Sequence, residues 1–180
     1  MKELELQKAF TLIEPGPVTM ITTSYQGKQN VMTISWTMVL DFTPQFAFMT
    51  GSWNYSYEAL VNTKECVIAI PTIDILDTVI NVGTTSGSNV DKFSGLGLTP
   101  LQASIVGAPL IKECYANIEC RITDYIEKQG IFVLDAVKAW IDEERNDKRT
   151  FHAIGDGTFV IDGEKFDRKK QMREKLPPGV

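Results

Sequence analysis

Short strand-like segments separated by turn-forming residues constrain this chain more than any other feature of its sequence. They are residues 18–25, 31–40, 46–50, 66–71, 115–124, 131–142 and 158–161. The helical candidates are few and short, at residues 57–63, 75–82 and 91–94. Because strands and helices do not alternate regularly, the pattern predicts a mainly β chain that forms an antiparallel barrel with small helices around it.

Local signals support these assignments. The stretch QGKQN supplies Gly27 for a turn and predicts a hairpin between the first two strands. Ser56 is a suitable N-cap for the helix at 57–63, and Asp74 and Gly83 would start and stop the helix at 75–82. IFVLDAVKAWID, at residues 131–142, is apolar on both sides, as in a strand buried in a barrel wall or against a partner subunit.

The charge balance narrows the class of function. The chain has 180 residues, enough for one domain, and its net charge of −5 disfavours binding to nucleic acid or to anionic membranes. The opening MKELELQKAF does not resemble a signal peptide, and no apolar run is long enough to span a bilayer. We therefore expect a cytoplasmic protein.

Few residues suit metal binding or covalent catalysis. Cys66, Cys114 and Cys120 are odd in number and lack C-x-x-C spacing, which predicts buried, reduced thiols. His152 is the single histidine; it could serve one acid/base step, but no motif places it in a triad. No phosphate-binding P-loop or complete dinucleotide fingerprint occurs. The sequence predicts no metal site and no covalent catalytic residue.

Residues 31–38 alternate in character along the second strand. Met32, Ile34, Trp36 and Met38 are large and apolar, whereas Val31, Thr33, Ser35 and Thr37 are small. Alternate side chains of a strand point to opposite faces, which assigns Met32, Ile34 and Met38 to the core and leaves Trp36 ambiguous. The small face is either a half-exposed surface or a place where a planar ring can approach the backbone.

Two further segments have residue types that suit an anion. SWNYSY, at residues 52–57, leads into a helix whose first N–H groups could bind phosphate, although ordinary capping by Ser56 explains it equally. Lys92 follows a glycine-rich stretch and could close over a phosphate from a flexible loop, or form a surface pair with Asp91. Taken together with the small strand face, these segments predict a phosphorylated, ring-bearing cofactor.

Several motifs in order resemble one protein family. NVMTISWTMVLDFTP is similar to the N-G-M-T-x-S-W…D-P-P stretch of the flavin reductase-like, FMN-binding split-barrel proteins. Similar spacing continues through SWNYSYEAL, DKFSGLGL, APLIKECYANIECRI, IFVLDAVKAWID and FHAIGDGTFVIDG, the last two most like the flavoredoxin branch. The resemblance covers about residues 15–165 of a single domain, with a tail at 166–180. It implies a six-stranded antiparallel split β-barrel, a homodimer, and FMN at or near the subunit interface.

The resemblance also assigns residues to the cofactor. Ser35, Trp36 and Thr37 would meet the isoalloxazine and ribityl part, largely through backbone groups. A second set would surround the phosphate, namely Ser52, Asn54, Ser56, Tyr57 and Lys92. Phe159, in the terminal strand, would lie beside the flavin ring.

Two departures from the family pattern bear on function. Asn54 stands where relatives commonly have arginine or lysine, and Gln129-Gly130 stands where many flavin reductases have a Gly-Asp-His that assists the nicotinamide substrate. The sequence therefore favours a flavoredoxin-type protein that relays electrons through FMN to a redox partner protein. An NAD(P)H-dependent flavin reductase is the alternative, and a non-enzymatic ligand-binding barrel is the third. Residues 131–142 are expected to contribute to the dimer interface.

Overall fold

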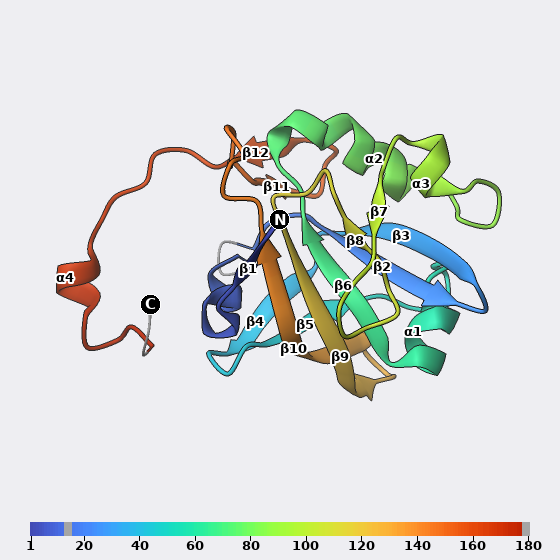
Figure 1. The fold of residues 1–180 in the computed structure, drawn as a ribbon, viewed down its shortest axis with the longest axis horizontal. Helices are drawn as coiled ribbons and strands as arrows, with labels where there is room; N and C mark the ends of the chain where they lie inside the picture. Colours follow the sequence, from blue (N-terminus) through green and yellow to red (C-terminus); the bar gives the residue numbers. More distant parts are fainter. Residues whose placement is uncertain (13–15, 178–180) are drawn as a thin grey trace.

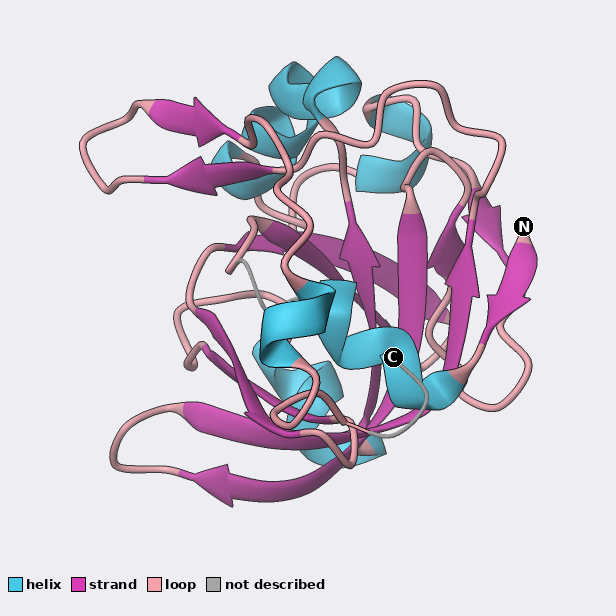
Figure 2. Cartoon of the chain, turned by 90° about the vertical axis from the view of Figure 1, so that its left-hand side faces the viewer, coloured by secondary structure: helices cyan, strands magenta, loops and turns pink. Residues whose placement is uncertain are grey.

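One antiparallel sheet dominates the fold. The computed structural model describes residues 1–12 and 16–177. The sheet runs in the order β3 (Lys28–Ile34), β2 (Thr19–Tyr25), β6 (Glu65–Ile70), β9 (Ala116–Ile126), β10 (Ile131–Ile141), β5 (Gln45–Met49) and β4 (Thr37–Asp41), and β1 (Lys2–Leu4) pairs with β10. β3 and β4 end this order on opposite sides, yet only Ser35 and Trp36 separate them in the chain. The strands curve round a common interior as a barrel (Figure 2). The strand pairings place the split in this barrel at Ser35 and Trp36.

Short helices and ribbons surround the barrel. They are α1 (Tyr57–Thr63), α2 (Leu76–Thr84), α3 (Lys92–Gly95), α4 (Lys169–Met172), 3₁₀ turns at Leu6–Leu12 and Ile73–Ile75, and the ribbons β7 (Pro100–Leu101) with β8 (Leu110–Ile111) and β11 (Phe151–Ala153) with β12 (Phe159–Ile161). α2 and α3 lie together at one end of the barrel, whereas α4 stands apart on the arm that follows β12 (Figure 1). Among the described residues, no helix has the length and apolar character needed to cross a membrane.

Two apolar clusters explain why these segments pack. The barrel interior contains fully buried Phe46, Phe48 and Phe132, with the rings of Phe48 and Phe132 stacked at a centroid distance of 5.5 Å. The second cluster lies between the sheet and α2, where Val31 contacts the group that includes Val79. Burying a side chain of this size contributes about 1.5–3 kcal/mol. β3 is therefore covered on both faces, which is how α2 and α3 are held against it.

The structure corrects the prediction of one continuous strand over residues 31–40. Hydrogen bonding to β2 ends at Ile34, and pairing with β5 begins at Thr37. Because the paired strand changes between Ile34 and Thr37, the assignment of alternate side chains to the core does not extend past Ile34. Met38 is 54% exposed and does not belong to the core. Trp36 is 66% exposed, which resolves its ambiguity in favour of the surface.

The predicted helix caps are wrong in detail. The Asp74 carboxylate accepts hydrogen bonds from Thr72 and Arg145 rather than capping α2. Gly83 lies inside the last turn of α2 rather than stopping it. Ser56 does occupy the N-cap of α1, but its side chain makes no capping bond. For Asp74 and Ser56, partners outside the helix bind the polar side chain that the local pattern assigned to a cap.

Other expectations are confirmed. β2 and β3 form the predicted hairpin with a two-residue turn, in which Gln26 and Gly27 have φ angles of 49° and 75°. Cys66, Cys114 and Cys120 are free and buried. The mainly β fold class with few short helices is confirmed. The predicted six strands correspond to this sheet if β3 and β4 count as one interrupted strand and the short β1 is set aside.

A buried carboxylate fixes the loop between β7 and β8. Glu119 on β9 is fully buried and accepts backbone hydrogen bonds from Ser104, Ile105 and Val106 at 2.6–3.1 Å. The Trp140 indole N–H adds a fourth bond at 2.8 Å. Burial raises the pKa of Glu119, but these four donors together lower it below its ordinary value. The ionised carboxylate is therefore the form that holds this loop.

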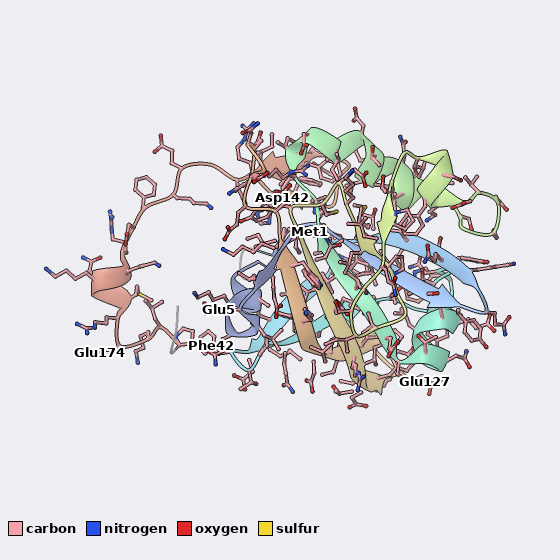
Figure 3. All side chains as sticks on the ribbon, in the orientation of Figure 1. Met1, Glu5, Phe42, Glu127, Asp142 and Glu174 are labelled. Carbon is pink, nitrogen blue, oxygen red and sulfur yellow. The ribbon has the colours of Figure 1, made fainter. Side chains whose placement is uncertain are left out.

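We predict that Glu119→Gln destabilises the protein by about 1–3 kcal/mol, because an amide cannot accept all four hydrogen bonds and would direct an NH₂ group at donors. Urea unfolding at pH 7 measures the effect. Glu127→Gln, in the exposed turn labelled in Figure 3, is the matched control and should change little. Equal unfolding midpoints for both variants would contradict the role assigned to Glu119.

Candidate functional site

The split between β3 and β4 exposes backbone donors. The Trp36 carbonyl accepts a hydrogen bond from the Met49 N–H at 3.0 Å, which keeps the chain attached to β5. Among the described residues, the N–H groups of Ser35 and Trp36 have no hydrogen-bond partner. A backbone that passes from one neighbouring strand to another thus leaves two adjacent donors for a ligand.

Thr37, the next residue, adds an unsatisfied side chain. Its Oγ1 atom is buried and has no hydrogen-bond partner within the described part of the chain. Buried hydroxyls are nearly always paired in folded proteins, and exceptions often mark a place where a ligand or ion binds. The break therefore has both unpaired backbone donors and an unpaired hydroxyl.

The segment after β5 forms a compact turn beside this break. The Asn54 N–H donates to the Gly51 carbonyl at 3.0 Å, and the Asn54 side-chain amide donates to Thr50 Oγ1 at 2.8 Å. The Trp53 ring lies so close over Gly51 that a Cβ at Gly51 would be 2.2 Å from it. Glycine at position 51 therefore lets the Trp53 ring lie directly over the turn, and a larger residue there would displace this ring.

Lys92 contributes a buried cation. It lies on α3 and is 5% exposed, and its Nζ donates to the carbonyls of Val31 at 2.9 Å and Val82 at 2.7 Å. An ammonium group has three N–H donors, so one remains for a ligand. Burial lowers the pKa of Lys92 from 10.5 to about 8. The prediction of a lysine on a flexible loop is thus wrong, because Lys92 is anchored to β3 and α2.

Two adjoining cavities gather these groups. The first, of about 210 Å³, is lined by Asn54, Ser56 and Lys92 together with residues 82–87, and we call it the lysine cavity. The second, of about 190 Å³, is lined by Ser35 and Trp36 among others, and we call it the strand-break cavity. They share Thr33, Trp53 and Asn54. The shared residues join the two cavities into one elongated site.

The lining of the lysine cavity suits a small anion. Residues 84–86 contribute three consecutive hydroxyl side chains, next to the Lys92 ammonium. Among the described lining residues of either cavity there is no carboxylate. The Ser56 hydroxyl is fixed by a hydrogen bond from the Asn30 amide at 2.8 Å. One charged donor among several neutral ones matches a single phosphate group.

The structure brings together only some of the residues predicted for the cofactor. Ser35, Trp36, Asn54, Ser56 and Lys92 line the two cavities. Thr37 follows Trp36 directly but lines neither cavity.

Besides Thr37, three predicted residues lie outside both cavities. Ser52 is exposed, and Tyr57 packs on the barrel side of α1 against Tyr125, with ring centroids 5.9 Å apart. Phe159 packs edge-on against Phe151 at 5.8 Å in the β11–β12 ribbon. Their assignment to the cofactor remains a prediction.

Sequence reasoning missed several lining residues. Trp53 and Thr33 border both cavities, and Asn30 and Gly87 border the lysine cavity. A Cβ at Gly87 would lie 2.3 Å from Asn30 Oδ1, so this glycine permits close approach of the loop to β3. The glycine- and hydroxyl-rich composition of residues 83–87 was the signal that could have identified this wall.

Comparison with known proteins assigns the chain to a family. A family model described as flavin reductase like domain matches residues 13–156. The chain belongs to the flavin reductase-like family. The resemblance noted in its motifs is thereby confirmed. An uncharacterized protein of Archaeoglobus fulgidus is 40% identical over 101 residues, which span 56% of this chain and 57% of the relative.

Solved structures agree with this assignment. An FMN-binding domain of a flavin reductase-like enzyme from Shewanella baltica superposes with a TM-score of 0.85 at 25% identity, covering 92% of this chain and 95% of that one. Flavoredoxin of Desulfovibrio vulgaris superposes with a TM-score of 0.77 at 24% identity, covering 85% and 90% respectively. The split-barrel fold of the flavin reductase-like family is therefore the fold of this chain.

We predict that the buried Lys92 gives the flavin-free protein a distinctive dependence of stability on pH. Its folded pKa of about 8 lies below the ordinary value of 10.5, so between these values the unfolded chain binds more protons. The free energy of unfolding attributable to Lys92 should therefore rise from pH 8 to pH 10.5, by up to about 3 kcal/mol.

Urea unfolding of wild type and Lys92→Met at pH 7 and pH 10 measures this effect. The stability of wild type relative to Lys92→Met should increase by about 2–3 kcal/mol between these pH values. The exposed Lys128→Met serves as the control and should show no such trend. A constant difference between wild type and Lys92→Met would show that the pKa of Lys92 is not lowered.

Proposed function

We propose that this chain is an FMN-binding redox protein of the flavoredoxin type, which relays electrons through bound FMN to a redox partner protein. The observation that carries the proposal is the elongated site, which has a phosphate-suited lysine cavity at one end and unpaired backbone donors at the other. The protein's membership of the flavin reductase-like family supports the flavin. We retain a cytoplasmic location as a prediction from sequence.

The residues present fit FMN. The third N–H of Lys92, the hydroxyls of Thr85 and Ser86 and the Asn54 amide would bind the phosphate, whereas the Thr84 hydroxyl already donates to the Ile80 carbonyl at 3.0 Å. The N–H groups of Ser35 and Trp36 would bind the polar edge of the isoalloxazine ring. Trp53, which borders both cavities, would cover the ribityl chain between these ends. The two backbone donors of the strand break and the third N–H of Lys92 each acquire a partner in this arrangement, whereas the buried Thr37 hydroxyl lies outside both cavities and its contact with the cofactor stays a prediction.

When bound, FMN supplies the electron-transfer chemistry, and the protein binds, orients and tunes it. Reduction of the flavin increases the electron density at the ring edge that the strand break would contact. Fixed N–H donors stabilise negative charge that develops beside them, because they need no reorganisation. Ser35 and Trp36 would therefore raise the reduction potential of the bound flavin above that of free FMN.

The turn before β10 favours relay over a dedicated NAD(P)H:flavin reductase. Gln129-Gly130 stands where many family reductases have a histidine that assists the nicotinamide. Gly130 has a φ of 67°, its carbonyl accepts the Thr50 N–H at 2.9 Å, and a Cβ would lie 2.6 Å from the Thr50 carbonyl. The turn is thus held against the start of the cofactor segment without an imidazole. NAD(P)H remains a possible electron donor in the reductase alternative.

Purification followed by denaturation and identification of the released flavin tests the proposal. We expect FMN, slow oxidation of NADH and NADPH by the holoprotein, and rapid electron exchange once the flavin is reduced chemically. Rapid NAD(P)H oxidation with freely exchanging flavin would instead favour the reductase. A colourless protein that takes up no FMN would support the non-enzymatic barrel and reject the proposal.

Lys92→Met is the sharpest variant for FMN affinity. Methionine is unbranched and keeps most of the length of the side chain but removes the ammonium group, and a charge-assisted bond to phosphate contributes about 1.5–3 kcal/mol. The dissociation constant for FMN should rise about ten- to a hundredfold, measured by quenching of flavin fluorescence at pH 7. Riboflavin, which lacks the phosphate, should lose little affinity. An equal loss for both ligands would mean that the variant had damaged the fold.

An exposed apolar stripe supports assembly into a homodimer. Trp36, Met38 and Leu40 occupy alternate positions at and beyond the strand break and are 66%, 54% and 44% exposed. Phe42, labelled in Figure 3, extends the stripe and is 50% exposed. Such a row rarely faces water in a monomer. Burial against a second copy would place the interface beside the strand-break cavity, with the β10 segment as a further predicted contributor.

Met38→Asp should convert the dimer to a monomer, because it places a charge at the centre of the stripe. Size-exclusion chromatography with light scattering at micromolar concentration is the measurement. Ile126→Asp is the matched control; Ile126 is 43% exposed and precedes Glu127, which lies on the other side of the barrel from Phe42 (Figure 3). A monomeric wild type, or a dimeric Met38→Asp, would reject this interface.

A further inference from the structure

A third and much larger cavity adjoins the lysine cavity. It measures about 970 Å³ and lies between the turn of the β2–β3 hairpin and residues 87–100. It shares Tyr55 and Gly87 with the lysine cavity, so the two meet at these residues. We call it the hairpin cleft. It begins where a bound FMN would end, at the phosphate, and FMN itself would leave it unused.

The boundary between the two cavities is shaped by Gly87. A Cβ at this position would lie 2.3 Å from Asn30 Oδ1 and 2.6 Å from Tyr55 Cδ1. Because glycine has no Cβ, the backbone of the loop can lie directly against the Asn30 and Tyr55 side chains. The loop therefore contacts β3 without adding a side chain at the junction, which keeps the phosphate end next to the cleft.

The lining of the hairpin cleft is mixed in a way that suits a nucleoside phosphate. Tyr55 is 44% exposed and offers a flat ring on which a base could stack. Hydroxyls and amides line the cleft, including those of Ser24, Gln29 and Asn89, and could bind a ribose. Val90 and Leu98 add apolar area. This combination of an aromatic ring, neutral polar groups and apolar area is typical of small-ligand sites.

The charge of the cleft limits its ligand. Lys28 is the one lysine or arginine among the described lining residues, and Asp91 is the one carboxylate. The Asp91 carboxylate is already occupied, since it accepts hydrogen bonds from the Phe93 N–H at 3.1 Å and the Ser94 hydroxyl at 2.9 Å. One available cation suits one phosphate and disfavours polyphosphates or nucleic acid, which bind through many basic residues.

We propose that the hairpin cleft is a subsite for the adenosine monophosphate half of a dinucleotide. FAD is FMN joined through its phosphate to such a half, so its flavin would occupy the two smaller cavities while its adenosine lies against Tyr55. Lys28 would neutralise the second phosphate. NADH contains the same half and is the other source of this chemistry; NADPH contains it with an added 2′-phosphate, for which the lining offers no second lysine or arginine among the described residues. The inference rests on the proposed function, because it takes the lysine cavity as the site of the flavin phosphate.

Titration of the full-length, flavin-free protein with FMN and with FAD tests the subsite. FAD should bind with a dissociation constant no more than about tenfold above that of FMN. Lys28→Ala should weaken FAD about tenfold and leave FMN within about twofold, because a single charge-assisted contact is lost. Asn89→Trp, which places a bulky ring in the wall of the cleft, should also weaken FAD selectively. Lys128→Ala, an exposed lysine in the β9–β10 turn, is the control and should affect neither flavin.

A second titration separates the two sources of the adenosine half. The FMN-loaded protein is titrated with NADH and NADPH, and the same variants are compared. Selective weakening of a pyridine nucleotide by Lys28→Ala and Asn89→Trp would assign the subsite to that donor rather than to FAD. If the binding of FAD, NADH and NADPH is insensitive to both variants, the subsite is overturned while FMN binding stands. Failure of FMN itself to bind would instead reject the proposed function.

Discussion

The passage of one chain segment between two neighbours determines both the fold and the site. Residues 28–34 pair with β2, and residues 37–41 pair with β5. This change of partner closes the barrel, because β3 and β4 lie at opposite ends of the sheet order. It also prevents Ser35 and Trp36 from completing a ladder, and it turns Trp36 and Met38 outward. The donors that could bind a ring and the stripe that could bind a second subunit thus arise from the same break.

Lys92 connects this break to the rest of the structure. Its ammonium joins carbonyls from β3 and α2, and α3 places it there through an N-cap at Asp91. Burying the charge costs stability, which the lowered pKa of about 8 reflects. A hydrophobic residue there would avoid this cost but would leave the Val31 and Val82 carbonyls without the Lys92 donor. Lys92 therefore joins β3 to α2, and its third N–H would be available to an anionic ligand. A nearby phosphate would restore the pKa towards its ordinary value, and binding and protonation would be coupled above pH 8.

The sequence predicted the fold further than it predicted the site. Hairpin, strand and helix positions followed from turn residues and apolar patterns, because local chemistry determines them at 18–34, 57–63 and 131–141. The interruption at Ser35 could not be read from alternation, since Thr37–Asp41 remains strand-like and only the neighbouring strand changes. Likewise, local patterns could not predict the hydrogen bonds between Asp74 and Arg145 or between Ser56 and Asn30, because these partners are distant in sequence. The family motifs pointed to Ser35, Asn54 and Lys92, which line the cavities. The place of residues 83–87 depends on the packing of α2 against β3, and that of Trp53 on the turn after β5, in which its ring lies over Gly51.

The distribution of donors explains how an acidic chain can bind a phosphorylated cofactor. With Asn54 in place of a cation, Lys92 is the one basic side chain among the described residues that line the lysine cavity, and neutral hydroxyls complete the set. Binding by neutral donors depends on their geometry more than on long-range attraction, so it is less sensitive to salt than binding by several lysines. It also selects for shape: a single phosphate satisfies one ammonium and a few hydroxyls, whereas a second phosphate needs the separate charge of Lys28. Discrimination between a mononucleotide and a dinucleotide would then depend on the hairpin cleft rather than on the flavin site itself.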